Sequence, residues 1–239
     1  MRALNVIKHK TNLTNILIDI YKDSNLAPVL GFKGGTAAML FYELPRLSVD
    51  LDFDLVALDK DSSDKIDGVI DSMTKLLTAK YTIKDQSKKF NTLFWLVSYG
   101  EGLTNIKIEI STRENPYNHY ELKSFYGVKV MVLDIKDMIA HKMVAAMQRR
   151  SAANRDLFDI HFFLKTKFAG EVNYNIIKER TGKTPKKFYR DLLSFVQEIA
   201  PKSVLAGLGE ILTESQKDWA KAKLIEELQG LIQRQIALL

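Results

Sequence analysis

Apolar residues recur along the chain at two different spacings, and each spacing predicts one kind of secondary structure. Residues 1–20 carry apolar side chains at the three- and four-residue intervals of an amphipathic helix. Residues 48–56 alternate between apolar and polar side chains, which is the period-two pattern of a β-strand. The predicted strands are 29–32, 48–56, 81–84, 92–99, 104–111 and 127–132. The predicted helices are 1–20, 36–43, 62–80, 134–150, 155–165, 172–180, 185–199 and 212–238.

The order of these elements divides the chain near residue 130. Strands and helices are interspersed before that point, whereas only helices are predicted after it. No internal repeat and no low-complexity linker marks the junction. We therefore expect an α/β (α+β) domain with a mixed sheet at 1–130, followed by an α-helical domain at 131–239.

The composition excludes several classes of function. The 239 residues are 46% hydrophobic and 27% charged, which is ordinary for a globular protein. They include no cysteine, which removes disulfides, thiolate catalysis and cysteine-ligated metals, and the four histidines lack metal-ligand spacing. No run of about 18 apolar residues occurs, and the basic start lacks the apolar core of a secretory signal. We expect a soluble cytoplasmic protein with no membrane partner.

The formal net charge of +6 lies almost wholly in the second half of the chain. Residues 131–239 contain 18 Lys and Arg against 13 Asp and Glu, whereas residues 1–130 contain 17 against 16. Within the second half, residues 178–190 hold six basic residues and one acid around Phe188 and Tyr189. This mixture suits phosphate contacts with base stacking, and it equally suits a solvated helical surface.

The most informative stretch joins a glycine turn to an acidic strand. Strand alternation places Asp50, Asp52 and Asp54 on one face, where like charges repel unless a cation neutralises them. Hard oxygen ligands of this kind suit Mg²⁺ or Mn²⁺. Upstream, Gly34 and Gly35 lie between a strand and a helix, where backbone N–H groups can approach a phosphate. The alternative is an exposed edge strand with a polar face, but the two features together are more specific than either alone.

These residues carry a resemblance to a known family. Residues 33–37 (Lys-Gly-Gly-Thr-Ala) and 46–53 (Arg-Leu-Ser-Val-Asp-Leu-Asp-Phe) look like the first motif of AbiEii-type nucleotidyltransferases. Three further family motifs follow in order: residues 107–111 (Lys-Ile-Glu-Ile-Ser), a helix with Lys142, and residues 155–159 (Arg-Asp-Leu-Phe-Asp). The matches cover about half of the chain, and the last 80 residues carry no matching motif.

The resemblance implies a DNA polymerase β-like nucleotidyltransferase core, an NTP substrate and a toxin with a cognate antitoxin. It further implies an RNA acceptor, for which tRNA is the candidate, and metal ligation by Asp50 and Asp52. The implied catalytic residues are Asp50, Asp52, Glu109, Lys142 and Asp156. The implied nucleotide-binding residues are Lys33, Gly34, Gly35, Thr36, Ser48 and Lys142. The helical domain is expected to contribute Lys142 and Asp156 to the cleft.

The residues themselves leave some of these roles open. Glu109 is either a base for the attacking hydroxyl or part of a Lys/Glu/Ser solvent face. Lys142 lies at the centre of an apolar helix face and needs an anionic partner, which is either the triphosphate or Asp156. Asp156 is also suited to the first turn of a helix, and Arg155 with Asp159 forms a possible architectural pair at i, i+4.

Three functions are therefore compared. The leading hypothesis is metal-dependent transfer of a nucleotide from an NTP to an acceptor. The alternatives are a nucleotide- or RNA-binding protein of the same fold without turnover, and a metal-dependent phosphohydrolase or nuclease. A transferase extends its acceptor, whereas a nuclease shortens RNA.

Overall fold

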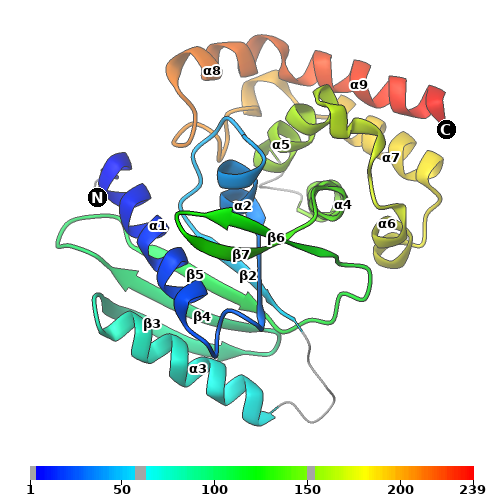
Figure 1. Cartoon of the computed structure of the whole chain (residues 1–239). Helices are drawn as coiled ribbons and strands as arrows, with labels where there is room; N and C mark the ends of the chain where they lie inside the picture. The colour runs from blue at the N-terminus through cyan, green and yellow to red at the C-terminus, as the bar shows by residue number, and fades with distance from the viewer. Residues whose placement is uncertain (1–3, 57–62, 150–153) are drawn as a thin grey trace. The chain divides into compact units, whose positions relative to one another are not determined.

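The computed structural model describes residues 4–56, 63–149 and 154–239, which divide into two compact units (Figure 1). The first unit consists of Met1–Glu43, Ser48–Pro116 and Tyr120–Leu133. The second consists of Leu44–Leu47, Tyr117–His119 and Asp134–Leu239. Two short segments from the first half of the chain thus belong to the second unit by their contacts.

The first unit is built on a seven-stranded mixed sheet in the order β3-β4-β5-β2-β1-β7-β6. Its strands are β1 (Leu30–Lys33), β2 (Leu51–Leu55), β3 (Thr82–Lys89), β4 (Thr92–Ser98), β5 (Ile106–Ser111), β6 (Tyr120–Phe125) and β7 (Val128–Leu133). Its helices are α1 (Val6–Lys22), α2 (Gly34–Phe41) and α3 (Ser63–Thr78). The central strand β2 pairs antiparallel with β1 and parallel with β5, so both of its edges are hydrogen-bonded.

Strand alternation creates the core of the first unit on one face of this sheet. Every second residue of β4 and β5 is buried, and the large side chain among them is Trp95. The indole N–H of Trp95 donates to Thr74 of α3 at 3.1 Å, which places α3 on that face. Figure 1 shows α1 and α3 running along the sheet there. The opposite face of β4 and β5 carries the half-buried positions.

The second unit is helical. Its helices are α4 (Ile135–Gln148), α5 (Asn154–Lys165), α6 (Tyr174–Thr181), α7 (Pro185–Gln197), α8 (Glu214–Trp219) and α9 (Ile225–Leu238), with single turns at η1 (Lys167–Gly170), η2 (Pro201–Ser203) and η3 (Ala220–Leu224). Local chemistry sets several boundaries. Gly182 ends α6 with φ +68°, and Thr184 caps α7 with Pro185 in its first turn. A capping box between Thr213 and Gln216 starts α8.

The structure agrees with most of the predicted elements and corrects three points. Strand β6 was missed: its first four residues (Tyr-Glu-Leu-Lys) alternate, but Ser124 and Phe125 break the pattern and leave only a short alternating run. The helix predicted at 212–238 is interrupted by a π-helical turn at η3. Phe188 and Tyr189 are fully buried in α7, so neither can stack on a base. None of the described helices is both long enough and apolar enough to span a membrane.

Candidate active site

Three neighbouring strands bring charged side chains into one row across the sheet. The register aligns Lys33 of β1 with Asp52 of β2, and Asp52 with Glu109 of β5. Paired residues of adjacent strands point to the same face. The alternation in β5 buries the isoleucines and leaves Lys107 and Glu109 half-exposed on this face. Strand β2 is shorter than the strand predicted at 48–56, and Asp50 lies directly before its first residue. The carboxylate of Asp50 nevertheless contacts the ammonium of Lys107.

Asp52 is the electrostatically strained member of the row. Burial, reinforced by the negative charge of Asp50, raises the pKa of Asp52 to about 6. Glu109 also raises this pKa, whereas Lys107 and Lys33 lower it and do not fully compensate. A carboxylate that titrates this close to neutrality is typical of a functional site. Asp52 is therefore a carboxylate whose charged form is disfavoured first by burial and then by its acidic neighbours.

The glycine turn packs directly against this carboxylate. Gly34 has φ +79°, and a Cβ at this position would collide with Oδ2 and Cβ of Asp52. Any other residue would therefore be strained in its backbone and would push Asp52 away. The helix α2 begins at Gly34, and no side chain caps its first turn. Unused backbone N–H groups thus begin at the residue that touches Asp52.

Lys107 holds two carboxylates of the site together. Its ammonium lies 3.2 Å from Asp50 and 3.7 Å from Glu109. Burial lowers the pKa of Lys107, but attraction to Asp50 and Glu109 outweighs it and leaves the pKa above its ordinary value. Lys107 therefore stays charged at neutral pH and reduces the repulsion between the acidic groups.

The third aspartate of the strand has a separate environment. Asp54 is buried, and it accepts hydrogen bonds from Lys33 at 2.5 Å and from the hydroxyl of Tyr120 at 2.8 Å. Asp54 is therefore a buried, hydrogen-bonded residue and not a solvated one. Lys33, predicted to bind nucleotide, keeps part of its side chain exposed while it neutralises this aspartate.

Backbone contacts fix the segment that carries Asp50. The fully buried hydroxyl of Thr36 donates to the carbonyl oxygen of Asp50. The buried ring of His9 in α1 donates through Nε2 to the carbonyl of Val49 at 2.9 Å, since a carbonyl only accepts. Its Nδ1 then accepts from the hydroxyl of Tyr99 at 2.9 Å. His9 and Tyr99 were missed from the sequence, although a histidine on the buried side of the first helix was a usable signal.

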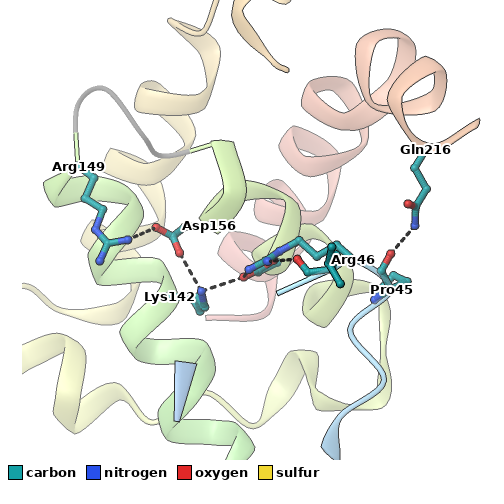
Figure 2. Close-up of polar contacts among 8 residues, drawn as sticks. Pro45, Arg46, Lys142, Arg149, Asp156 and Gln216 are labelled. Carbon is teal, nitrogen blue, oxygen red and sulfur yellow. Dashed lines mark hydrogen bonds and ion pairs between the residues drawn. The ribbon is translucent and has the colours of Figure 1, made fainter. Parts of the chain in front are cut away.

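The predicted residues Lys142 and Asp156 lie in the second unit, in a buried cluster of ion pairs (Figure 2). The ammonium of Lys142 lies 3.0 Å from Asp156 and 2.9 Å from Asp159. Arg46 forms a two-pronged contact with Asp159, at 2.5 Å and 2.7 Å. Arg149 lies 3.5 Å from Asp156. Each buried charge of the cluster therefore has at least one opposite charge beside it.

These contacts settle the charge states in the cluster. Burial lowers the pKa of Lys142, but attraction to Asp159 and Asp156 is stronger and raises it overall. Burial raises the pKa of Asp159, but Lys142 and Arg46 pull it below its ordinary value. The predicted pair between Arg155 and Asp159 is wrong, because Arg155 is exposed whereas Asp159 is fully buried on Arg46 and Lys142. The architectural role predicted for Asp159 agrees with this burial.

Comparison with known proteins identifies the family. The family model described as "Nucleotidyl transferase AbiEii toxin, Type IV TA system" matches residues 15–224. The chain belongs to the AbiEii nucleotidyltransferase toxin family. The match includes all four motifs that suggested this family in the sequence, and it extends through most of the second unit. Among curated proteins, none matches this AbiEii chain.

Solved structures show that the AbiEii chain has a nucleotidyltransferase-like fold. A candidate nucleotidyltransferase from Helicobacter pylori has a TM-score of 0.63 and 20% identity, over 99% of this chain and 96% of its own. JHP933 from Helicobacter pylori also has a TM-score of 0.63, with 19% identity over 99% and 94% of the two chains. An antigenic nucleotidyltransferase-like protein from Paracoccidioides brasiliensis has a TM-score of 0.51 and 16% identity, over 85% and 93%.

The donor chemistry of the AbiEii site fits a hard divalent cation. Asp50 and Asp52 are carboxylates two residues apart, and a cation would stabilise the ionised form of Asp52, which burial and the charge of Asp50 disfavour. Within the described residues, no group of three or more histidine and carboxylate side chains is already arranged around a metal position. Mg²⁺ does not need such a cage, because it commonly binds one or two protein carboxylates and takes its other ligands from phosphate and water.

Proposed function

We propose that this chain transfers a nucleotide from an NTP to a hydroxyl group of an acceptor, with Mg²⁺ or Mn²⁺ held by Asp50 and Asp52. The hydroxyl oxygen bonds to the α-phosphorus, the bond between the α- and β-phosphates breaks, and pyrophosphate leaves. The observation that carries the proposal is the packing of Gly34 on Asp52 within the row of charged residues. The uncapped first turn of α2 thus starts next to one of the two carboxylates that we propose as metal ligands, which supports the proposal. A triphosphate needs both features, because its oxygens accept hydrogen bonds and its charge requires a cation.

Different groups of the chain have different roles in the proposed reaction. The first turn of α2, with Gly34 and Gly35, binds phosphate oxygens through backbone N–H groups. Glu109, on the neighbouring strand, accepts the proton of the attacking hydroxyl. The chemistry supplied by a bound Mg²⁺ is neutralisation of charge on the triphosphate and on the attacking oxygen. Thr36 positions Asp50, because its hydroxyl donates a hydrogen bond to the backbone carbonyl of that residue.

The acceptor and the biological role follow from the family. We propose RNA as the acceptor, with tRNA as the first candidate, and a cognate antitoxin encoded by a neighbouring gene. The excess of positive charge in residues 131–239 supports an anionic macromolecular partner. The expected catalytic role of Lys142 and Asp156, and the expected nucleotide binding by Lys142, stay predictions.

The test uses the purified chain with each labelled NTP, Mg²⁺ and total RNA. We expect label to appear covalently on RNA, and to be lost in Asp50→Ala and Asp52→Ala without loss of folding. The matched control is Asp71→Ala, which removes an exposed carboxylate from α3. RNA that is shortened without labelling identifies a nuclease, and NTP binding without either product identifies a binding protein.

The toxin role has its own test. Induction of the wild-type chain in a bacterial host should slow growth, and co-expression of the neighbouring gene should relieve it. The Asp52→Ala variant is the control, because it retains the fold and lacks the metal ligand. Equal growth of the two strains would refute the toxin role and would leave the proposed nucleotide transfer untouched.

A further inference from the structure

The row of charged residues in the first unit continues beyond Glu109 to an aromatic ring. The register pairs Glu109 of β5 with Phe94 of β4, and Phe94 with Ser87 of β3. Phe94 therefore lies on the same face as Asp52 and Glu109, one strand beyond Glu109. Adjacent strands are about 4.8 Å apart, so the ring lies roughly 10 Å across the sheet from Asp52.

Three contacts confirm which face Phe94 occupies. Its neighbour Trp95 donates to Thr74 of α3, so Trp95 points to the helix-covered face. Lys89 of β3 lies over the ring of Phe94, with its ammonium 4.7 Å from the ring centroid. The adjacent Lys88 points the other way and pairs with Asp67 of α3 at 3.0 Å. Phe94 and Lys89 thus belong to the carboxylate face.

Phe94 is an apolar residue that is only half-buried, as is Leu96 two residues further along the same face of β4, and Phe94 is the aromatic one of the two. The apolar side chains of β4 that point to the helix-covered face (Leu93, Trp95 and Val97) are buried, whereas Phe94 on the opposite face retains an accessible part beside the half-exposed Glu109. An aromatic ring that is open to solvent and next to a lysine is suited to stacking on a nucleobase. The contact of the exposed Lys89 with the ring is weaker than base stacking, so a base can displace this ammonium.

The order of groups across the sheet assigns the two substrates to opposite sides of Asp52. The first turn of α2 touches Asp52 from the β1 side, and Glu109 and Phe94 follow on the other side. We infer that Phe94 stacks on the terminal base of the nucleic-acid acceptor, with Lys89 beside its phosphate. The ribose is next to the base in a nucleotide, so its hydroxyl then lies towards Glu109. The inference rests on the proposed transfer to RNA and specifies which face holds the acceptor.

The first test measures binding, so it does not depend on turnover. The probes are two labelled single-stranded RNA oligonucleotides that are identical except that one has an abasic 3′-terminal residue. Wild type should bind the intact oligonucleotide about 5- to 150-fold more tightly, the range expected for stacking of one base. Phe94→Leu should lose this discrimination with an unchanged unfolding midpoint, and Phe94→Trp should restore it.

Lysine variants provide a matched pair. Lys89→Ala should weaken binding of both oligonucleotides equally and reduce the salt dependence by about one ion, as expected for one phosphate contact. Lys88→Ala should leave both affinities unchanged, because Lys88 faces α3. Discrimination that is equal in wild type and Phe94→Leu, or absent in wild type, would overturn the inference.

A second measurement separates this inference from the proposed function. With labelled NTP and RNA, Phe94→Leu should raise KM for the acceptor and leave KM for the NTP unchanged. If transfer occurs and Phe94→Leu alters neither value, the acceptor site is wrong while the transferase stands. If no transfer occurs yet discrimination depends on Phe94, the base-stacking site stands while the proposed reaction fails.

Discussion

Replacing Asp52 by Asn should abolish nucleotide transfer and at the same time stabilise the folded chain. The pKa of Asp52 rises from 3.8 to about 6 on folding, mainly through burial and then through Asp50. A difference of about two pKa units corresponds to roughly 3 kcal/mol at about 1.4 kcal/mol per unit. The charged carboxylate therefore destabilises the fold by up to about 3 kcal/mol at pH 7. Asn has nearly the same shape without this charge.

Proton binding at Asp52 determines how the free energy of unfolding changes with pH. Between about pH 4 and pH 6 the folded state binds more protons at Asp52 than the unfolded state does. The free energy of unfolding therefore falls as pH rises through this window, and the penalty is complete above pH 6. The gain in Asp52→Asn should be about 1–3 kcal/mol at pH 7 and should disappear near pH 4, where the wild-type carboxyl is itself protonated.

The assay is urea unfolding of both proteins at pH 4, 5, 6 and 7. Asp71→Asn is the control, because it makes the same charge change at an exposed position of α3 and should alter stability little. A gain that is equal at pH 4 and pH 7 would show that the charge of Asp52 is not its cause. No gain at pH 7 would refute the electrostatic strain itself.

The remaining predictions concern the two sets of buried polar contacts. Lys142→Met should lower the free energy of unfolding by about 3–5 kcal/mol in urea titrations, because Asp156 and Asp159 each lose a positively charged partner. Weak NTP binding with an unchanged free energy of unfolding would instead show that Lys142 binds the nucleotide. Asp159→Asn should be destabilising at pH 7, and the loss should shrink as pH falls below about 4, because the lowered pKa of Asp159 stabilises the fold only while the group is ionised. Tyr99→Phe should cost about 1 kcal/mol in the same titrations and shift the imidazole ¹⁵N resonances of His9, whose Nδ1 loses its donor.

Periodicity predicted the elements of the first unit well, because their burial follows the sheet faces. The alternation in 104–111 and 92–99 corresponds to the buried and half-buried positions of β5 and β4. Strand β6 escaped prediction because it lies at the edge of the sheet, where Leu122 is 67% exposed and no alternation is required. The helix at 212–238 was predicted as continuous, since a π-helical turn leaves no clear signature in apolar spacing.

The candidate site was less accessible to sequence reasoning than the fold. Sequence spacing places Asp50, Asp52 and Asp54 together. It cannot show that Lys33 neutralises Asp54, that Tyr120 donates a hydrogen bond to it, and that Asp52 is left strained. Pairings between distant segments decide this difference, and they are set by strand order. The same limit applies to Arg46, whose partner Asp159 lies 113 residues away.

One short motif serves both units of the chain. Arg46 and Asp50 are separated by three residues, yet Leu44–Leu47 belongs to the second unit and Ser48 onwards to the first. Arg46 is buried on Asp159, and the N–H of Leu47 donates to Ile211 at 3.0 Å, so this segment is fixed by the helical unit. The backbone of Val49 and Asp50 is fixed by His9 and Thr36 of the sheet unit. The segment that carries Asp50 is therefore held at its two ends by different parts of the chain. This gives a physical reason for an arginine four residues before Asp50 and for a buried aspartate at the end of the motif at residues 155–159.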